Sequence, residues 1–184
     1  MKKHILPSIK LSIISMLVFV VFYTLVVWGI AFVAAPNHGE GEVVTVNGKV
    51  VGYKLVGQSF TQAKYFNGRP SSVSYNAAGS GGSNKGPSNP DYLKGVQAAI
   101  DSFMLHNPTV KKSDVPVELV TMSGSGLDPD ISPKAAWVQI PRIAQSRHLS
   151  EEQINALVKK HIEKPLFGPE HVNVLLLNVD LDKL

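Results

Sequence analysis

The stretch that decides the architecture is "LSIISMLVFVVFYTLVVWGIAFVAA", Leu11–Ala35, which contains no charged residue. A helix rises about 1.5 Å per residue, so about 25 residues extend nearly 38 Å and exceed the hydrocarbon core of about 30 Å. The apolar core of a cleaved signal peptide, the alternative interpretation, has only about 7–15 residues. The run therefore predicts one retained transmembrane helix over residues 11–35.

The charges on either side of this run predict its orientation. Three lysines precede it: Lys2, Lys3 and Lys10. The segment after it, "PNHGEGE", carries Glu40 and Glu42 and no lysine or arginine before Lys49. Positively charged flanks stay on the cytoplasmic side. We therefore expect residues 1–10 in the cytoplasm and residues 36–184 outside, in the periplasm of a Gram-negative cell, on a single-pass protein of the inner membrane.

Net charge and cysteine content exclude some functions of the outer segment. Removing the three N-terminal lysines from the total of 18 Lys and Arg leaves 15, against 14 Asp and Glu. A nearly neutral segment argues against nucleic-acid binding, which needs a basic patch on the folded domain. The chain has no cysteine, which excludes disulfides and thiolate chemistry.

Residues 36–184 read as a small α+β domain. "VVTVNGKVVGYKLVG" holds two β-rich runs around Asn47-Gly48, which supply the positive φ angles of a type I′ hairpin. A helix is expected from Pro90 to near Asn107, capped by the preceding polar residues. A second helix should start at Ser132-Pro133 and be kinked or broken at Pro141, and a third should start at Ser150, whose Gln153 partner completes a capping box.

Two further apolar runs are predicted as strands. "VPVELVTMS" indicates a short strand over Val115–Met122, and "HVNVLLLNVDL" indicates a buried strand that closes the chain. The expected order is then β-β-α-β-α-α-β, which is typical of an α+β domain.

Two loops rich in small residues are candidate functional segments. "GSGGSNKGPSNP", Gly79–Pro90, resembles a phosphate-binding loop, but Lys85 precedes Gly86 and Pro87 removes a backbone donor. We interpret it as a tight loop that leads into a helix. "SGSGLDPDISP", Ser123–Pro133, places Asp128 near a second carboxylate, which fits turn chemistry better than a cation site.

Catalytic and metal-binding signals are weak. The six histidines are scattered and no H-E-x-x-H motif occurs, so a metal site is not expected. Ser125 lacks the G-x-S-x-G spacing of a nucleophile elbow. "KYFNGRPSS" groups aromatic side chains with an arginine, which suits either a binding surface or a packed loop with a buried aromatic pair.

Several blocks together resemble the C subunit of the Kdp-type potassium-transporting ATPase: "LVGQSF", "YFNGRPSS", "SGGSNKGPSNP", "VPVELVTMSGSGLDPDISPKAAWVQIPRIAQSR" and "VNVLLLNVDLDKL". The resemblance implies a non-catalytic subunit with no cofactor of its own, which assembles with a channel-like A subunit, an ATP-hydrolysing B subunit and a small F peptide. It also implies a role as a catalytic chaperone that raises the ATP affinity of the B subunit, while the complex handles ATP and potassium. The phosphorylation motif D-K-T-G-T is absent from the chain.

The family's proposed nucleotide-contacting glutamine would fall on Gln139, in "WVQIP". ATP is cytoplasmic, whereas the lysines place Gln139 on the opposite side of about 30 Å of hydrocarbon. Either the effect on ATP is indirect, which we favour, or the domain is cytoplasmic and contacts the nucleotide. Candidate contacts with other subunits lie in the two loops and the aromatic-arginine block: Tyr65, Phe66, Gly68, Arg69, Pro70, Gly82, Ser83, Asn84, Asn89, Ser125, Gly126 and Asp128.

Overall fold

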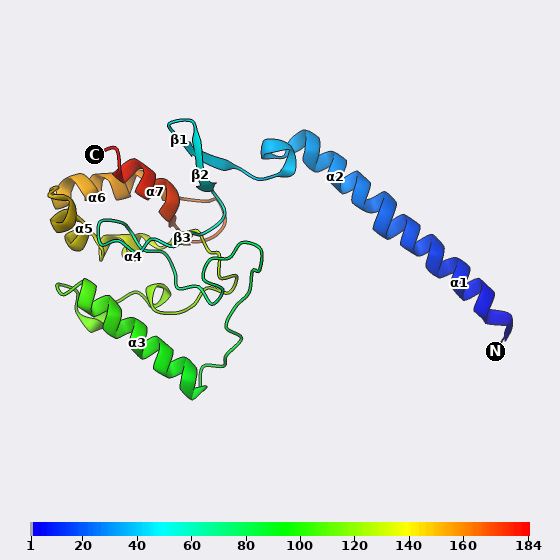
Figure 1. Ribbon diagram of the computed structural model, residues 1–184, viewed down its shortest axis with the longest axis horizontal. Helices are drawn as coiled ribbons and strands as arrows, with labels where there is room; N and C mark the ends of the chain where they lie inside the picture. The colour runs from blue at the N-terminus through cyan, green and yellow to red at the C-terminus, as the bar shows by residue number, and fades with distance from the viewer. Residues whose placement is uncertain (1) are drawn as a thin grey trace. The chain divides into compact units, whose positions relative to one another are not determined.

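The computed structural model describes residues 2–184. The chain divides into two units, one that ends at Val43 and one from Val44 to Leu184. Figure 1 labels their helices and strands.

The first unit is a long apolar helix. Helix α1 (Lys2–Met16), the π-helical stretch η1 (Leu17–Phe22) and helix α2 (Tyr23–Ala34) follow one another without a break, because Met16, Phe22 and Tyr23 keep right-handed helical angles. Its segment His4–Ala34 has 31 residues and includes an 18-residue stretch with a mean hydropathy of 2.6, so it is long and apolar enough to cross a membrane. The expected single apolar helix is therefore present, although it begins ahead of Leu11. The membrane limits themselves stay a prediction.

A left-handed turn ends this helix. The 3₁₀ turn η2 (Pro36–Gly39) holds Asn37 and His38 at φ angles of 51° and 55°. The His38 ring stacks on Phe32 with ring centroids 4.6 Å apart. The chain leaves the helix through a defined turn at this point.

The second unit begins with the predicted hairpin. Strand β1 (Val43–Val46) pairs with β2 (Lys49–Tyr53), and the turn residues Asn47 and Gly48 have φ angles of 50° and 75°. Both central residues have the positive φ that a type I′ turn needs, which confirms the prediction.

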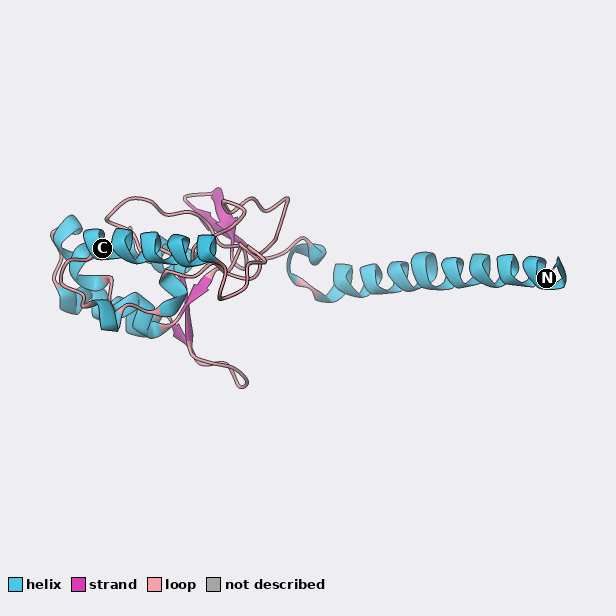
Figure 2. Cartoon of the chain, turned by 90° about the horizontal axis from the view of Figure 1, so that it is seen from below, coloured by secondary structure: helices cyan, strands magenta, loops and turns pink. Residues whose placement is uncertain are grey.

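The second unit also contains a small antiparallel sheet, drawn in magenta beside the helices in Figure 2. Strand β5 (His171–Asn173) lies between β3 (Asp130–Ile131) and β4 (Ile162–Glu163), in the order β3-β5-β4. Val172 is opposite Ile131 on one side and Ile162 on the other. The three strands bring residue 130 and residue 173 side by side, although they are far apart in the sequence.

Capping side chains mark the first residues of the helices in the second unit. Asn89 accepts from the N–H groups of Asp91 and Tyr92 at the start of α3 (Pro90–His106). Ser150 and Gln153 form the predicted capping box of α6 (Glu151–Lys160). The predicted break near Pro141 separates α4 (Pro133–Trp137) from α5 (Ile140–Arg147). These helix predictions are confirmed.

Both remaining strand predictions are wrong over most of their length. In the first run, η4 (Val117–Leu119) is a 3₁₀ turn after η3 (Lys112–Asp114), since Pro116 cannot donate to a strand ladder. In the second, the strand ends at Asn173, whose side chain accepts from the Leu176 N–H and starts α7 (Val174–Leu181). A continuous apolar run fits a buried helix as well as a strand.

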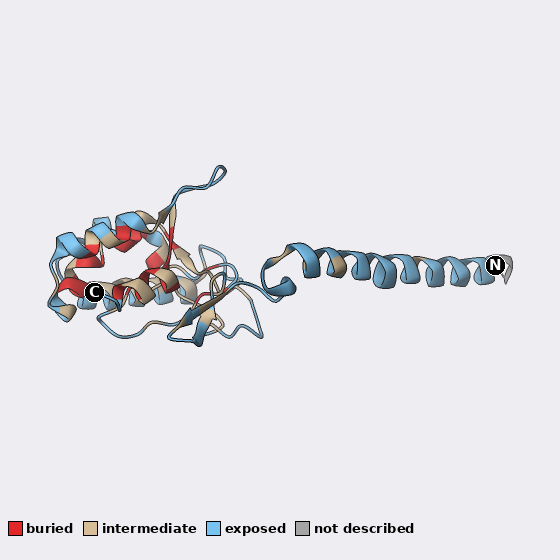
Figure 3. Cartoon of the chain, turned by 90° about the horizontal axis from the view of Figure 1, so that it is seen from above, coloured by how far each residue is buried: buried red, intermediate tan, exposed pale blue. Residues whose placement is uncertain are grey.

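The hydrophobic core lies between β5 and the helices α4–α7, where Figure 3 shows buried residues. Ile143, Ile154, Val158, Val172 and Leu177 have no exposed surface. Helix α7 is also fixed by polar contacts, because Asn178 accepts from the N–H of Phe66 (2.9 Å) and donates to its carbonyl (3.0 Å). The chain's last helix is therefore bound to a segment 112 residues earlier.

Candidate functional site

The two small-residue loops pair with each other. Gly81 N–H donates to the Ser125 carbonyl over 2.8 Å, and the Ser80 hydroxyl donates to the same oxygen over 3.0 Å. A Cβ at Gly82 would lie 2.9 Å from the Gly124 carbonyl oxygen. The glycines thus allow one loop's backbone to approach the other within the chain.

A third segment holds this pair of loops. The Ser71 hydroxyl donates to the Gly126 carbonyl and the Ser72 hydroxyl to that of Gly81, both over 2.7 Å. Gly126 has a φ of 70°, and a Cβ there would lie 2.5 Å from Val73 Cγ2 and 2.8 Å from the Gly81 oxygen. Gly126 is therefore required by both its conformation and its surroundings. We name the three segments 71–76, 79–90 and 123–133 the loop clasp.

An ion pair lies beside the loop clasp. Arg69 Nη1 is 3.0 Å from Asp128 Oδ2, and the two side chains are 27% and 29% exposed. The second Asp128 oxygen accepts from the Asp130 N–H over 3.1 Å, which is the expected turn chemistry. The Tyr75 hydroxyl donates to the Arg69 carbonyl, and burial, followed by the nearby Asp128 charge, raises the pKa of Tyr75.

The predicted contact residues separate into surface and interior groups. Gly82, Ser125, Gly126, Arg69 and Asp128 meet in or beside the loop clasp, where Pro70 accepts from Ser123. Ser83 is half-buried and Asn84 is exposed, with a φ of 53°.

The remaining predicted contact residues have partners within the domain. Asn89 caps α3, Phe66 is fully buried, Gly68 lies near the Tyr75 hydroxyl, and Tyr65 donates to Asp182 over 2.9 Å. Asn84 and Ser125 are the exposed residues of the set, and the Ser125 hydroxyl already accepts from the Leu127 N–H, which leaves Asn84 as the better candidate for a contact with a partner.

Asp130 offers a test of local electrostatics. Burial raises its pKa above the ordinary value, and the charge of Asp128 adds to the rise while His171 opposes it. A raised folded-state pKa means that the ionised form costs stability above that pKa, and the cost disappears as pH falls to the unfolded-state value.

Asp130→Asn should therefore raise the thermal midpoint by about 1–2 °C at pH 7, because the amide keeps an oxygen for Asn173. The gain should shrink as pH falls toward 4, as measured by thermal unfolding of the full chain in detergent. A gain that is constant over this range would contradict an ionic origin.

Gln139 lies in the interior. Its side chain has no exposed surface, and all four hydrogen-bonding positions of its amide are occupied. Oε1 accepts from Asn67 N and Arg142 Nη2, both over 2.8 Å. Nε2 donates to the carbonyls of Ala135 (2.9 Å) and Asn67 (3.2 Å). A nucleotide would have to displace these contacts to reach the amide.

The partner of Gln139 is a buried cation that sequence reasoning missed. Arg142 is 9% exposed and uses all five guanidinium N–H groups. Its five partners are neutral oxygens on Ala63, Tyr65, Asn67, Asn107 and Gln139. Burial lowers the pKa of Arg142 to about 10. The only signal in the sequence is an arginine inside the apolar pattern of "WVQIPRIA".

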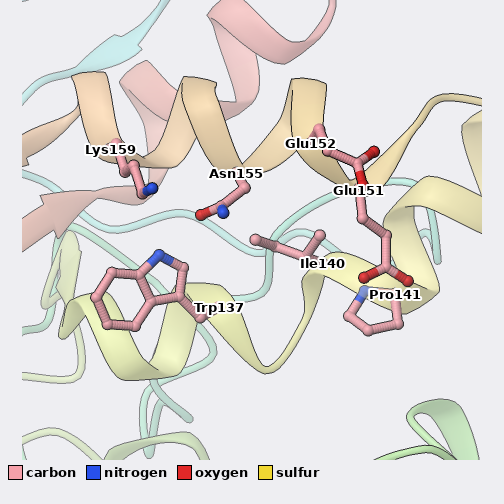
Figure 4. Close-up of a pocket in the computed structure, with 7 residues that line it drawn as sticks. All are labelled: Trp137, Ile140, Pro141, Glu151, Glu152, Asn155 and Lys159. Atoms are coloured by element: carbon pink, nitrogen blue, oxygen red, sulfur yellow. The ribbon is translucent and has the colours of Figure 1, made fainter.

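An open pocket of about 470 Å³ lies between α4–α5 and α6 (Figure 4). In Figure 4 the Trp137 ring faces Asn155 and Lys159, which project from α6. Glu151 and Glu152 stand in the first turn of α6, where carboxylates stabilise the positive helix end. Within residues 2–184 no group of three His, Cys, Asp or Glu side chains could hold a metal ion.

The chain thus combines one helix that is long and apolar enough to cross a membrane with a small α+β domain whose loops pair internally. A family model described as "K+-transporting ATPase, c chain" matches residues 5–183. The chain belongs to this family of potassium-transporting ATPase subunits.

Similar proteins agree with this assignment. Two are named "Potassium-transporting ATPase KdpC subunit" in Flavobacterium johnsoniae (54% identical over 182 residues, 99% of each chain) and Bacteroides fragilis (54% over 187 residues, 99% and 98%). A relative of the same name in Bacillus cytotoxicus is 42% identical over 180 residues and covers 96% of this chain and 94% of its own.

Proposed function

We propose that the chain is required for assembly of a potassium-transporting ATPase and acts as a catalytic chaperone that raises the ATP affinity of the B subunit without touching ATP. Its partners are the A, B and F subunits, and those subunits handle potassium and ATP. The observation that carries this proposal is the family match over residues 5–183. The full occupation of the Gln139 amide supports the indirect route.

The proposed location is the inner membrane, with the N-terminus in the cytoplasm and the α+β domain in the periplasm. The lysines at positions 2, 3 and 10 support this orientation. An effect on ATP from that side must pass through helices to an element with two arrangements in the B subunit. The alternative, direct nucleotide contact by Gln139, needs a cytoplasmic domain and an opened network around that side chain.

Cysteine labelling in intact cells tests the orientation. Because Gln139 is fully buried, we choose the exposed positions Ser80→Cys and Leu105→Cys in this cysteine-free chain, with Ser8→Cys as the control before the apolar run. We expect a membrane-impermeant thiol reagent to label the first two in intact cells and Ser8→Cys only after lysis. The reverse pattern would place the domain in the cytoplasm and favour direct nucleotide contact.

The exposed Asn84 side chain tests the loop clasp as an assembly surface. Asn84→Gly removes the side chain and suits the φ of 53°. We expect about tenfold lower recovery of the detergent-purified complex, with normal amounts of the chain in membranes.

His148→Gly is the matched control, because His148 is also exposed with a positive φ of 57° and ends α5. Equal recovery of both variants and wild type would count against Asn84 as a contact.

A further inference from the structure

The loop between β4 and β5 carries two adjacent apolar side chains that are almost fully exposed. Leu166 is 90% exposed and Phe167 is 87% exposed, more than any other large apolar residue described from Val44 onward. Figures 2 and 3 show this loop projecting from the sheet with an exposed surface. Single exposed apolar residues are common, but an aromatic-aliphatic pair at a projecting tip indicates a contact surface.

The residues around Leu166 and Phe167 restrict the conformation of the projecting loop. Pro165 and Pro169 flank the pair, and Gly168 reverses the chain at a φ of 109°. At the base, Lys164 Nζ lies 2.7 Å from Glu170 Oε1. Two prolines and a closed base restrict the unbound loop, so less conformational entropy is lost when the tip binds.

The charge of the loop distinguishes between two surfaces that could cover its tip, an anionic lipid surface and a pocket on another protein. The segment 163–170 has one lysine and two glutamates, which gives a net charge of −1. Anionic lipid headgroups repel such a segment and attract basic ones. A protein pocket with an apolar floor and a neutral or basic rim suits both the pair and the charge.

We propose that Leu166 and Phe167 form an anchor that inserts into an apolar pocket with a neutral or basic rim on another subunit of the potassium-transporting ATPase. This inference rests on the proposed assembly with other subunits, and it adds a contact separate from the loop clasp. Aromatic anchors in such pockets dominate the affinity of many interfaces. The double variant Leu166→Ser/Phe167→Ser should therefore lower recovery of the detergent-purified complex by at least about tenfold.

Photo-crosslinking in the assembled complex identifies what covers the tip. Phe167 is replaced by p-benzoylphenylalanine in the full chain, co-expressed with the other subunits, and the same replacement at Leu105, which is 78% exposed on α3, is the control. We expect an adduct with another ATPase subunit at position 167, in clearly higher yield than at position 105. Adducts with lipid only, no adduct, or equal yields at the two positions would overturn the proposal.

The recovery assay separates this inference from the assembly proposal. Leu105→Ser is the control for the double variant and should be recovered like wild type. If the double variant is recovered with the complex as well as the wild-type chain, the anchor proposal is wrong and the assembly proposal stands. Failure of the wild-type chain to purify with any other subunit overturns both, because the anchor then has no partner.

Discussion

Replacing Arg142 by methionine should lower the free energy of unfolding of the full chain in detergent by about 3–5 kcal/mol. Methionine fills much of the volume but donates no hydrogen bond. Four of the oxygens that the guanidinium contacts lose their donor, whereas Gln139 Oε1 keeps the Asn67 N–H. Each unpaired buried acceptor costs about 1–3 kcal/mol, and removal of a buried charge offsets part of the sum.

Thermal unfolding followed by tryptophan fluorescence measures this effect. Arg142→Lys should fall between wild type and Arg142→Met, because an ammonium group keeps the charge but has three donors in place of five. Lys160→Met is the control, since Lys160 is exposed on α6 and surface changes usually stay within about 0.5 kcal/mol. If Arg142→Met unfolds at the same temperature as Lys160→Met, the hydrogen bonds of the Arg142 guanidinium do not stabilise the domain.

Gln139→Ala should lower the free energy of unfolding by about 2–3 kcal/mol. The change removes the oxygen that accepts from Asn67 and Arg142 and the two N–H groups that donate to Ala135 and Asn67. It also leaves a small cavity beside the guanidinium. The destabilisation should be visible in the full chain in detergent without ATP or any other subunit.

The same variant separates the two views of the effect on ATP. If Gln139 acts by holding the fold, then Gln139→Ala and Arg142→Met should both raise the KM of the purified complex for ATP, in the order of their loss of stability. If Gln139 touches the nucleotide, Gln139→Ala should raise KM while Arg142→Lys, which keeps the cation beside it, leaves KM unchanged. The KM values for ATP of these variants therefore distinguish an indirect effect from direct nucleotide contact, which their stability alone does not.

Local signals predicted a large part of the fold. Asn47-Gly48, the Asn89 cap and the Ser150–Gln153 capping box each specify a structure within a few residues, and each is found where expected. The run after Val172 was assigned wrongly because apolar residues without a period suit a buried helix and a buried strand equally. A single capping side chain, Asn173, makes the difference.

The candidate site was harder to predict because its contacts are non-local. The pairing of Gly81 with Ser125 joins loops that are about 44 positions apart, and no local pattern encodes it. Arg142 reaches Ala63, 79 positions earlier, so its role depends on the completed fold. The sequence predicts these loops as candidate contacts with other subunits, and the structure shows that their small residues contact each other within the chain.

The Phe66–Asn178 contact also has a consequence for biosynthesis. Because the partners of Phe66 and of the Arg142 guanidinium are drawn from both halves of the domain, the core cannot be completed before α7 has been made. Phe66 therefore gains its native hydrogen-bond partner only after α7 has been synthesised, so the core is completed late and not segment by segment.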